Sequence, residues 1–143
     1  MPRLRKMDKE VEKKTKKITK KKLKVSDLDK IWSKLVRDRD GTCVHCGRFP
    51  VQAHHIFGRG YKSTRWNLDN GISLCYKCHM FWAHSKYEEF RDWIIETIGE
   101  EKYLSLKEQS QVIWTGTLQE EEETLIKTIS IQNNRNQLEQ TDK

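Results

Sequence analysis

Residues 43–84 of this chain read CVHCGRFPVQAHHIFGRGYKSTRWNLDNGISLCYKCHMFWAH, and this stretch decides the fold. It contains all four cysteines of the protein in two Cys-x-x-Cys pairs, Cys43 with Cys46 and Cys75 with Cys78. Four thiolates in two close pairs can surround one zinc ion tetrahedrally. The sequence therefore predicts a structural zinc site that ties together the two ends of the intervening loop. With every cysteine in metal-ligand spacing, we expect a reduced chain without disulfides.

Histidines lie inside this loop and directly after it. His54 and His55 are adjacent, and His79 follows the second cysteine pair at once. Successive side chains on a strand point to opposite faces, so the two adjacent imidazoles are expected to have different roles. One can bind a cation while the other faces a substrate. Two alternatives stay open: His54 replaces a cysteine as zinc ligand, or His79 merely packs against the zinc site.

The order of these motifs resembles that of the zinc-containing HNH, or His-Me finger, endonucleases. The resemblance rests on Cys-x-x-Cys, then Ala53-His54-His55-Ile56, then Asn70-Gly-Ile-Ser-Leu-Cys75-x-x-Cys78-His79, and it covers residues 43 to about 84. It implies an α+β fold: a small ββα-metal domain with a four-cysteine, treble-clef-like zinc site, flanked by helices. Within that family the chain is similar to the compact phage or mobile-element type.

The resemblance also implies residue roles. His55 would be the general base that takes a proton from water, and Asn70 would hold this base through a backbone or side-chain hydrogen bond. Asn67 is a rival to Asn70, but its spacing to Cys75 does not match the family.

A catalytic divalent cation, Mg²⁺, Mn²⁺ or another, is implied in addition to the structural Zn²⁺. The resemblance assigns His54 and His79 as its ligands. Some relatives carry a further histidine one helical turn after the closing histidine, where this chain has Ala83. His84 is adjacent but rotated by about a third of a turn, so it is kept as a candidate ligand or outer group.

The loop at residues 58–66 carries three cations, Arg59, Lys62 and Arg65. Because guanidinium groups bind phosphate oxygens bidentately, these residues are candidate contacts to a nucleic-acid backbone. Ordinary surface charge is the alternative, above all for Lys62. His45, between the first two cysteines, is expected to be an exposed residue of the knuckle.

Helices are predicted on both sides of this segment. Ser26 resembles an N-cap with Asp29 three residues later, and the helix it opens should end at Gly41. Its apolar stripe includes Trp32, which we interpret as a core residue. A helical turn is expected over residues 79–84. A second helix is predicted from a Ser85/Glu88 capping box to Gly99, with a core stripe of Tyr87, Phe90, Trp93, Ile94 and Ile98. A short helix is predicted over residues 103–114. A last helix is predicted to begin at a Thr117/Glu120 cap.

Charge divides the chain of 143 residues, which has a formal net charge of +7. Residues 1–24 hold 12 Lys and Arg against 3 Asp and Glu, whereas residues 96–143 hold 5 against 10. We expect a basic, disordered arm over 1–24, the HNH domain with helical flanks over 25–99, and a helical extension with an acidic, polar tail over 100–143. The arm would contact a phosphate backbone, and a solubilising or nuclear-localisation-like tail is the alternative.

The function implied by the resemblance is metal-dependent hydrolysis of DNA, with 5′-phosphate and 3′-hydroxyl products. A monomer with one base and one cation should nick, and cutting both strands would need a homodimer or two encounters. The alternative is a non-catalytic zinc module that binds nucleic acid or recruits a partner, such as a phage or mobile-element protein. No stretch can span a bilayer and no secretory segment is visible, so we expect a cytoplasmic protein, in a bacterial host if it is phage-encoded.

Overall fold

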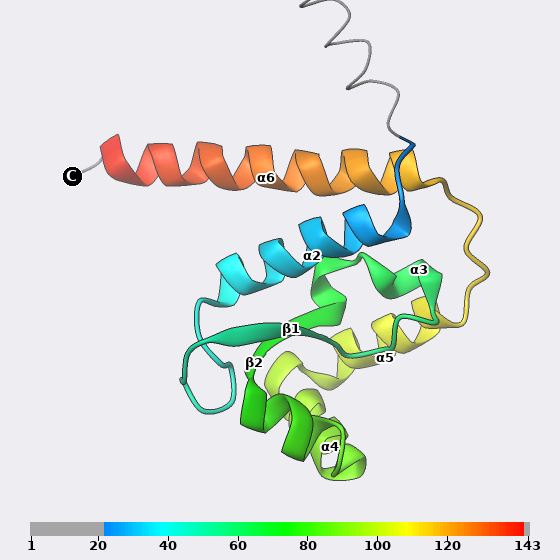
Figure 1. The fold of residues 1–143 in the computed structure, drawn as a ribbon, viewed down its shortest axis with the longest axis vertical. Helices are drawn as coiled ribbons and strands as arrows, with labels where there is room; N and C mark the ends of the chain where they lie inside the picture. Colours follow the sequence, from blue (N-terminus) through cyan, green and yellow to red (C-terminus); the bar gives the residue numbers. More distant parts are fainter. Residues whose placement is uncertain (1–21, 142–143) are drawn as a thin grey trace, which may run out of the picture.

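The computed structural model describes residues 22–141, in which helices surround a two-stranded antiparallel sheet (Figure 1). The elements in chain order are α2 (Val25–Asp40), β1 (Val51–His55), α3 (Lys62–Arg65), the 3₁₀ turn η1 (Leu68–Asn70), β2 (Gly71–Cys75), the π-helix η2 (Cys78–Ala83), α4 (Tyr87–Ile98), α5 (Glu100–Ser110) and α6 (Leu118–Thr141). The predicted mixture of helices with a small sheet is confirmed. The basic arm lies outside the described residues except for residues 22–24, so its predicted state stays a prediction.

The two strands pair antiparallel, with Val51 opposite Cys75 and His55 opposite Gly71. All five residues of β2 are buried, whereas β1 is only partly covered. Helix α2 lies across both strands, and this close approach requires glycine at position 71. A Cβ there would lie 2.4 Å from Cζ2 of Trp32, well inside van der Waals contact.

Helix α2 begins two residues earlier than the sequence predicted, because its N-cap is Lys24 and not Ser26. The Lys24 backbone N–H donates to the Asp27 carboxylate over 3.0 Å. Ser26 lies inside the first turn, so the predicted Ser26/Asp29 cap is wrong. The Asp29 carboxylate is instead engaged by side chains from another element. The helix ends as predicted at Gly41, whose φ of 72° is readily adopted by glycine.

Two hydrophobic clusters stabilise the protein. The first surrounds the cysteines and is closed by α4, whose Phe90 and Ile94 are buried. This confirms that the helix after η2 covers the cysteine site, although Tyr87, placed in its predicted core stripe, is exposed. The second cluster joins α2 to α6 through Leu125. In Figure 1, α6 runs alongside α2 on the side away from the sheet.

The capping predictions for the later helices have different outcomes. Helix α4 begins at Tyr87 without a side-chain cap, and the Ser85 hydroxyl donates to the Met80 carbonyl instead, so the Ser85/Glu88 capping box is wrong. Helix α6 opens on the predicted box: Thr117 N–H donates to the Glu120 carboxylate, and Glu120 N–H donates to the Thr117 hydroxyl. Within residues 22–141, no helix combines the length and apolar character needed to cross a membrane.

Candidate functional site

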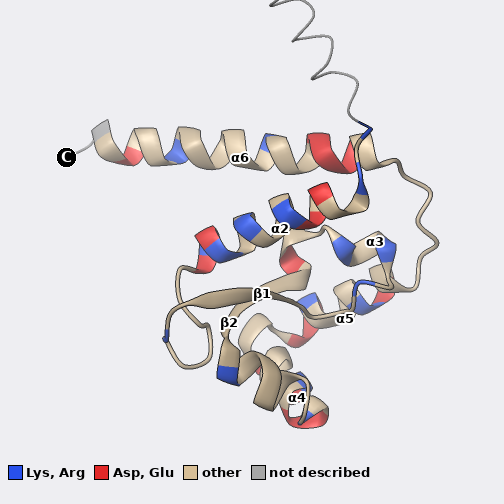
Figure 2. Ribbon diagram, in the orientation of Figure 1, with Lys and Arg blue, Asp and Glu red and all other residues tan. Residues whose placement is uncertain are grey.

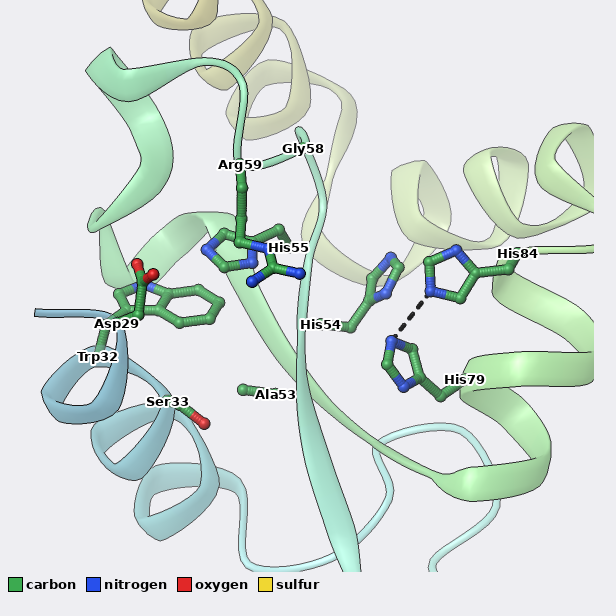
Figure 3. Close-up of a pocket in the computed structure, with 10 residues that line it drawn as sticks. All are labelled: Asp29, Trp32, Ser33, Ala53, His54, His55, Gly58, Arg59, His79 and His84. Atoms are coloured by element: carbon green, nitrogen blue, oxygen red, sulfur yellow. Dashed lines mark hydrogen bonds between the residues drawn. The ribbon is translucent and has the colours of Figure 1, made fainter. Parts of the chain in front are cut away.

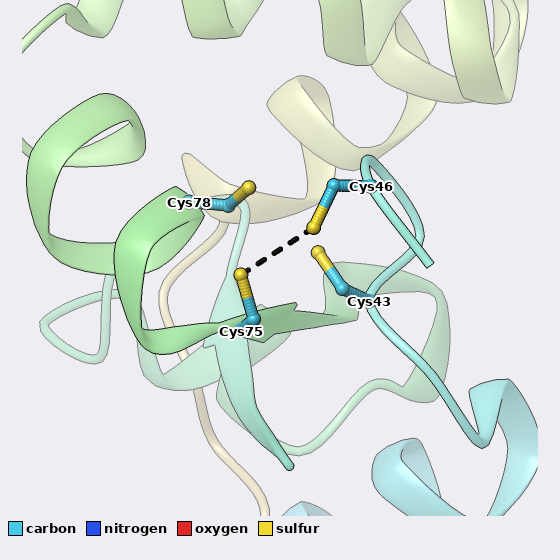
Figure 4. A group of neighbouring side chains, drawn as sticks. All are labelled: Cys43, Cys46, Cys75 and Cys78. Carbon is cyan, nitrogen blue, oxygen red and sulfur yellow. Dashed lines mark hydrogen bonds between the residues drawn. The ribbon is translucent and has the colours of Figure 1, made fainter. Parts of the chain in front are cut away.

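The four cysteines converge on one point (Figure 4). Cys43 and Cys46 come from the loop after α2, Cys75 ends β2 and Cys78 begins η2. Their sulfur atoms all lie within 4.8 Å of one another, and those of Cys46 and Cys75 are 3.5 Å apart. Zn–S bonds of about 2.3 Å in a tetrahedron place sulfurs about 3.8 Å apart. The cluster therefore fits one zinc ion. Because all four thiols lie at this point, His54 is not needed as a replacement ligand.

The pKa values of two of the clustered thiols, Cys75 and Cys78, are shifted in opposite directions. A hydrogen bond from the Cys78 backbone lowers the pKa of the Cys75 thiol to about 7. Burial, followed by the neighbouring cysteines, raises the pKa of Cys78. Four thiolates this close repel one another, and a divalent cation relieves that repulsion.

His45 has contacts that the sequence did not predict. It is exposed, as expected, but its Nδ1 lies 3.4 Å from the Cys78 sulfur. Its ring also packs on Trp82, with centroids 4.0 Å apart. A ring N–H beside a thiolate supports that ligand from outside the metal sphere.

A second potential metal-binding group consists of His54, His79 and His84, whose ring nitrogens lie within 4.8 Å of one another. Figure 3 shows these three side chains on one side of β1, with His55 on the other side, as alternation along a strand predicts. The Nε2 atoms of His79 and His84 are 3.1 Å apart. Two imidazoles on one tetrahedral zinc place their nitrogens about 3.3 Å apart, so this spacing fits a shared cation.

The π-helical winding of η2 is what brings His84 into this group. In a helix with i→i+5 hydrogen bonds, residues five apart lie above one another. The His84 backbone N–H donates to the His79 carbonyl over 3.3 Å. The expected rotation of His84 away from the site, based on α-helical geometry, is therefore wrong.

Gln52 fixes the protonation pattern of this cluster. It lies two residues before His54 on β1, and its Oε1 is 2.7 Å from Nδ1 of His79. An amide oxygen only accepts hydrogen bonds, so Nδ1 carries the proton and Nε2 keeps its lone pair for a metal. Burial, together with nearby histidine charges, lowers the pKa of His54 to about 3. The pKa of His79 is lowered by burial and by His84. His54 and His79 are therefore neutral at pH 7, as metal ligands must be.

His55 is clamped between an aromatic ring and a backbone carbonyl. Its ring stacks on Trp32 with centroids 3.8 Å apart and planes 12° apart. Its Nε2 is 2.9 Å from the Arg65 carbonyl oxygen, so Nε2 carries the proton of the neutral ring and Nδ1 is the free acceptor. Burial is the main cause that lowers the pKa of His55 to about 4. Trp32 is a core residue, as predicted, and it is also the platform of His55.

Within residues 22–141, the Asn70 side chain makes no hydrogen bond to the His55 ring, contrary to one of the two predicted ways of holding the base. Its amide oxygen accepts from the Phe57 N–H over 2.8 Å, and its amide nitrogen donates to the Phe57 and Thr64 carbonyls. Asn70 is fully buried. Asn70 therefore joins Phe57 and Thr64, the two ends of the segment 57–64. The residue after this segment, Arg65, supplies the carbonyl that accepts from His55. The side chain of the rival Asn67 bonds to the Asp69 backbone and to Gln109, and its backbone carbonyl accepts from Nε1 of Trp32 over 2.9 Å, so it contacts the platform of His55.

The three cations predicted on a loop differ in availability, and two of them, Lys62 and Arg65, lie in helix α3. Arg65 donates to Asp29 through Nε and Nη2, over 2.9 and 2.7 Å, and is largely buried. Burial raises the pKa of Asp29, but the hydrogen bonds from Arg65 and Trp66 and the charge of Arg65 bring it below its usual value. Arg65 is thus committed to a structural ion pair, which argues against its predicted role as a phosphate contact. Lys62 lies over the Trp114 ring, 5.2 Å from its centroid.

Arg59 remains next to the candidate site. Its side chain extends beside His55 in Figure 3 and makes no hydrogen bond or ion pair within residues 22–141. A cavity of about 420 Å³ brings these groups together. It is lined by Asp29, Trp32, Ser33, Ala53, His54, His55, Gly58, Arg59, His79 and His84.

Comparison with known proteins identifies the family. Residues 2–138 match the family model described as Bacteriophage Lambda NinG protein. The chain belongs to the NinG family. This agrees with the predicted phage-type, zinc-binding protein. No curated protein shows a significant match to the chain, and neither does any solved structure.

Three residues of this NinG-family site were missed as functional candidates in the sequence. Gln52 carried no motif, Asp29 was interpreted as part of a capping box, and Trp32 had only its place on an apolar stripe. Period-two alternation could have placed Gln52 on the His54 face of the strand. The contacts of Asp29 and Trp32 join residues more than 20 apart in the NinG chain, and spacing along the sequence contains no signal for them.

Proposed function

We propose that this chain is a metal-dependent HNH endonuclease that hydrolyses DNA phosphodiester bonds. The observation that carries the proposal is the single cavity of about 420 Å³ lined both by His55 and by the group His54, His79 and His84. A base and a cation-binding group within reach of one phosphate are the two requirements of metal-assisted hydrolysis. The chain order β1, β2 and η2 supports a ββα-metal, His-Me finger arrangement as the framework of this site.

His55 is the general base of the proposed reaction. Its Nε2–H donates to the Arg65 carbonyl, so its Nδ1 accepts a proton from water as the water oxygen attacks phosphorus. Because the ring is neutral at pH 7, it is ready to accept that proton. The stack on Trp32 fixes the plane of the ring. Asn70 is a positioning residue, because it fixes the loop that presents the Arg65 carbonyl.

The second group supplies the cation site. His54, His79 and His84 would hold a divalent cation, which neutralises charge on the phosphate and on the leaving 3′ oxygen. Three imidazoles without a carboxylate favour Mn²⁺, Co²⁺, Ni²⁺ or Zn²⁺ over Mg²⁺, since Mg²⁺ prefers oxygen ligands. Gln52 keeps the Nε2 lone pair of His79 available.

Arg59 supports the same reaction from the other side of β1. Its guanidinium lies beside His55 without a partner among the described residues, and it can bind oxygens of the scissile phosphate. One base and one cation serve one strand, so the proposed product is a nick with 5′-phosphate and 3′-hydroxyl ends. The basic arm over residues 1–24 would add affinity that depends on salt but not on sequence.

The experiment is cleavage of supercoiled plasmid by the zinc-loaded, full-length protein with Mg²⁺, Mn²⁺, Co²⁺ or Ni²⁺, or without added cation. We expect nicking with the nitrogen-preferring cations. His55→Ala should reduce the rate at least about 10³-fold, as removal of a general base does, while keeping wild-type zinc content and circular dichroism. Branched DNA and single-stranded RNA are tested in parallel to define the substrate.

Each result decides between nuclease and binding module. Nicking that is lost in the folded His55→Ala protein supports the proposal and the base. Absence of cleavage of plasmid, branched DNA and RNA by folded, zinc-replete protein would overturn it in favour of a non-catalytic zinc module. Equal cleavage by wild type and His55→Ala would reject His55 as the base.

A further inference from the structure

The cavity at the histidines continues into a second one along β1. This neighbouring cavity, of about 340 Å³, is lined by Ser33, Arg37, Val51, Gln52, Ala53 and His79. It shares Ser33, Ala53 and His79 with the first cavity. The two therefore form one groove between α2 and β1, which passes the histidine cluster. We refer to it as the α2–β1 groove.

An unpaired guanidinium lies at each end of the α2–β1 groove. At one end, Arg37 is exposed, and its only hydrogen bond within residues 22–141 runs from Nε to the Ser33 carbonyl over 3.2 Å. Its two terminal nitrogens are thus free. Arg59 occupies the other end, beside His55. A polyanion in the groove would meet a cation on each side of the histidines.

Helix α2 presents further donors along the same wall. Ser33 and Arg37 are four residues apart and share one face of the helix, and Lys30 lies three residues before Ser33. Lys30 is exposed and has no carboxylate partner in the described part of the chain. Lys34 differs, because it is paired with Asp38. Figure 2 shows these cations along α2 and no charged residue on β1 or β2, so the cationic side of the groove comes from the helix.

The dimensions of the groove suit a nucleic-acid strand. It follows β1 from Val51 to His55, a path of about 13 Å at about 3.3 Å per residue. The rise of about 3.4 Å per nucleotide applies along the duplex axis, and successive phosphates of one strand lie about twice as far apart, so the groove spans about two nucleotides. Its lining includes hydroxyl, amide and guanidinium donors, which suit phosphate oxygens. The Asp29 carboxylate also lines it, but this group is engaged by Arg65 and Trp66.

We infer that the α2–β1 groove binds the strand to be cut, and that Arg37 binds a backbone phosphate one or two nucleotides from the scissile one, on the Gln52 side of the histidine cluster. This inference rests on the proposed function and adds the path of the substrate. Arg37 is a substrate-binding residue in this assignment, and Arg59 marks the opposite end of the path.

The test is a double-mutant cycle between Arg37 and single phosphates of the substrate. A labelled DNA duplex containing a mapped cleavage site is prepared with one neutral methylphosphonate at each position on either side of that site. Binding of the full-length, zinc-loaded protein is measured by fluorescence anisotropy without added divalent cation, for wild type, Arg37→Gln and Lys34→Gln. Cleavage rates are measured separately with cation. Lys34→Gln is the matched control, with the same charge change on the same helix.

We expect Arg37→Gln to weaken binding about three- to tenfold and to reduce the salt slope by about one. Neutralising one phosphate, on one side of the cut only, should weaken wild type but leave Arg37→Gln unaffected. Equal responses of Arg37→Gln and Lys34→Gln at every position would overturn the inference, even if the wild type cuts.

The two proposals fail separately. If the wild type proves inactive, no cleavage site can be mapped. The phosphate scan then uses a duplex prepared with one nick, which fixes the register of the bound protein. A position-specific loss of the Arg37 effect there supports the groove as a strand-binding site without catalysis. Its absence there rejects the groove as well.

Discussion

At the scale of single residues, Gly71 determines whether His55 can be held in place. The indole of Trp32 reaches His55 only because no side chain projects from position 71, where a Cβ would lie 2.4 Å from Trp32 and 2.7 Å from Val36. Gly71→Ala should therefore push Trp32 outwards. We expect the free energy of unfolding to fall by about 1–3 kcal/mol, as for other overpacked cores, measured by urea denaturation.

Gly60→Ala is the matched control for this change. A Cβ at position 60 would meet no atom within 4 Å, so its effect should stay within about 0.5 kcal/mol. If the proposed function holds, Gly71→Ala should also slow cleavage, because the platform under His55 is displaced, whereas Gly60→Ala should not. Equal stability of the two variants would show that α2 can move away from β2 at little cost.

Residue-level prediction from sequence worked where chemistry was strong and local. The spacing of the four cysteines predicted their cluster, and alternation along a strand predicted that the side chains of His54 and His55 lie on opposite faces. Prediction failed for Arg65, which lies in helix α3 and not on a flexible loop, because the sequence does not show whether an arginine faces solvent or a carboxylate. Only the fold brings Asp29 of α2 to Arg65.

At the scale of elements, η2 shows why helix type matters to the site. The sequence predicted a helical turn after Cys78, and α-helical geometry placed His84 about a third of a turn away from the position of a third ligand. The π-helical winding places residue i+5 over residue i, and His84 then joins His79. Nothing in the letters CHMFWAH signals π rather than α winding, since the choice depends on packing around the turn.

Helix α6 offers a test of the second hydrophobic cluster. Leu125 is 2% exposed and packs against α2, whereas the next residue, Ile126, is 48% exposed. Leu125→Ala removes core contacts below α2 and should cost about 2–5 kcal/mol of unfolding free energy. Ile126→Ala, the same kind of truncation one position along, should change it by about 0.5 kcal/mol or less.

Thermal or urea unfolding of the two variants decides whether α6 is part of the folded unit. The sequence predicted this helix from its capping box but not its docking on α2, since one buried leucine in a polar helix is a weak periodic signal. Similar, small effects of both substitutions would mean that α6 is detached from α2 in solution.

At the scale of the whole molecule, β2 connects the two hydrophobic clusters. Its last residue, Cys75, belongs to the cysteine cluster, and its first, Gly71, packs under Trp32 in the cluster joined to α6. A loss of order at the cysteines should therefore reach α2 through a strand of five residues. Zinc removal is predicted to unfold both clusters in one transition.

The magnitudes favour this outcome. Structural zinc contributes about 10–16 kcal/mol of apparent binding free energy in small zinc domains, whereas a domain of this size is stable by about 5–15 kcal/mol in total. The zinc-free protein should therefore lose its near-ultraviolet circular dichroism, and its tryptophan emission should shift to the red. Trp82, beside His45, and Trp32, beside His55, report on the two clusters respectively.

The chain has five tryptophans, so one variant replaces Trp82 and Trp93 by Phe and keeps the signal of Trp32 and its cluster. A second variant replaces Trp32, Trp66 and Trp114 by Phe and keeps the signal of Trp82 and its cluster. Each variant is titrated with a chelator and then with Zn²⁺. Coincident transitions, reversed by Zn²⁺, are expected because β2 belongs to both clusters. If the Trp32 signal persists after zinc has been removed and the Trp82 signal is lost, α2 and α6 form an independent unit and β2 does not couple them. In that case the Trp32 platform of His55 would remain folded after zinc loss, whereas η2, which contains Cys78 and His79, would not. The proposed base and the proposed cation site would then be lost separately.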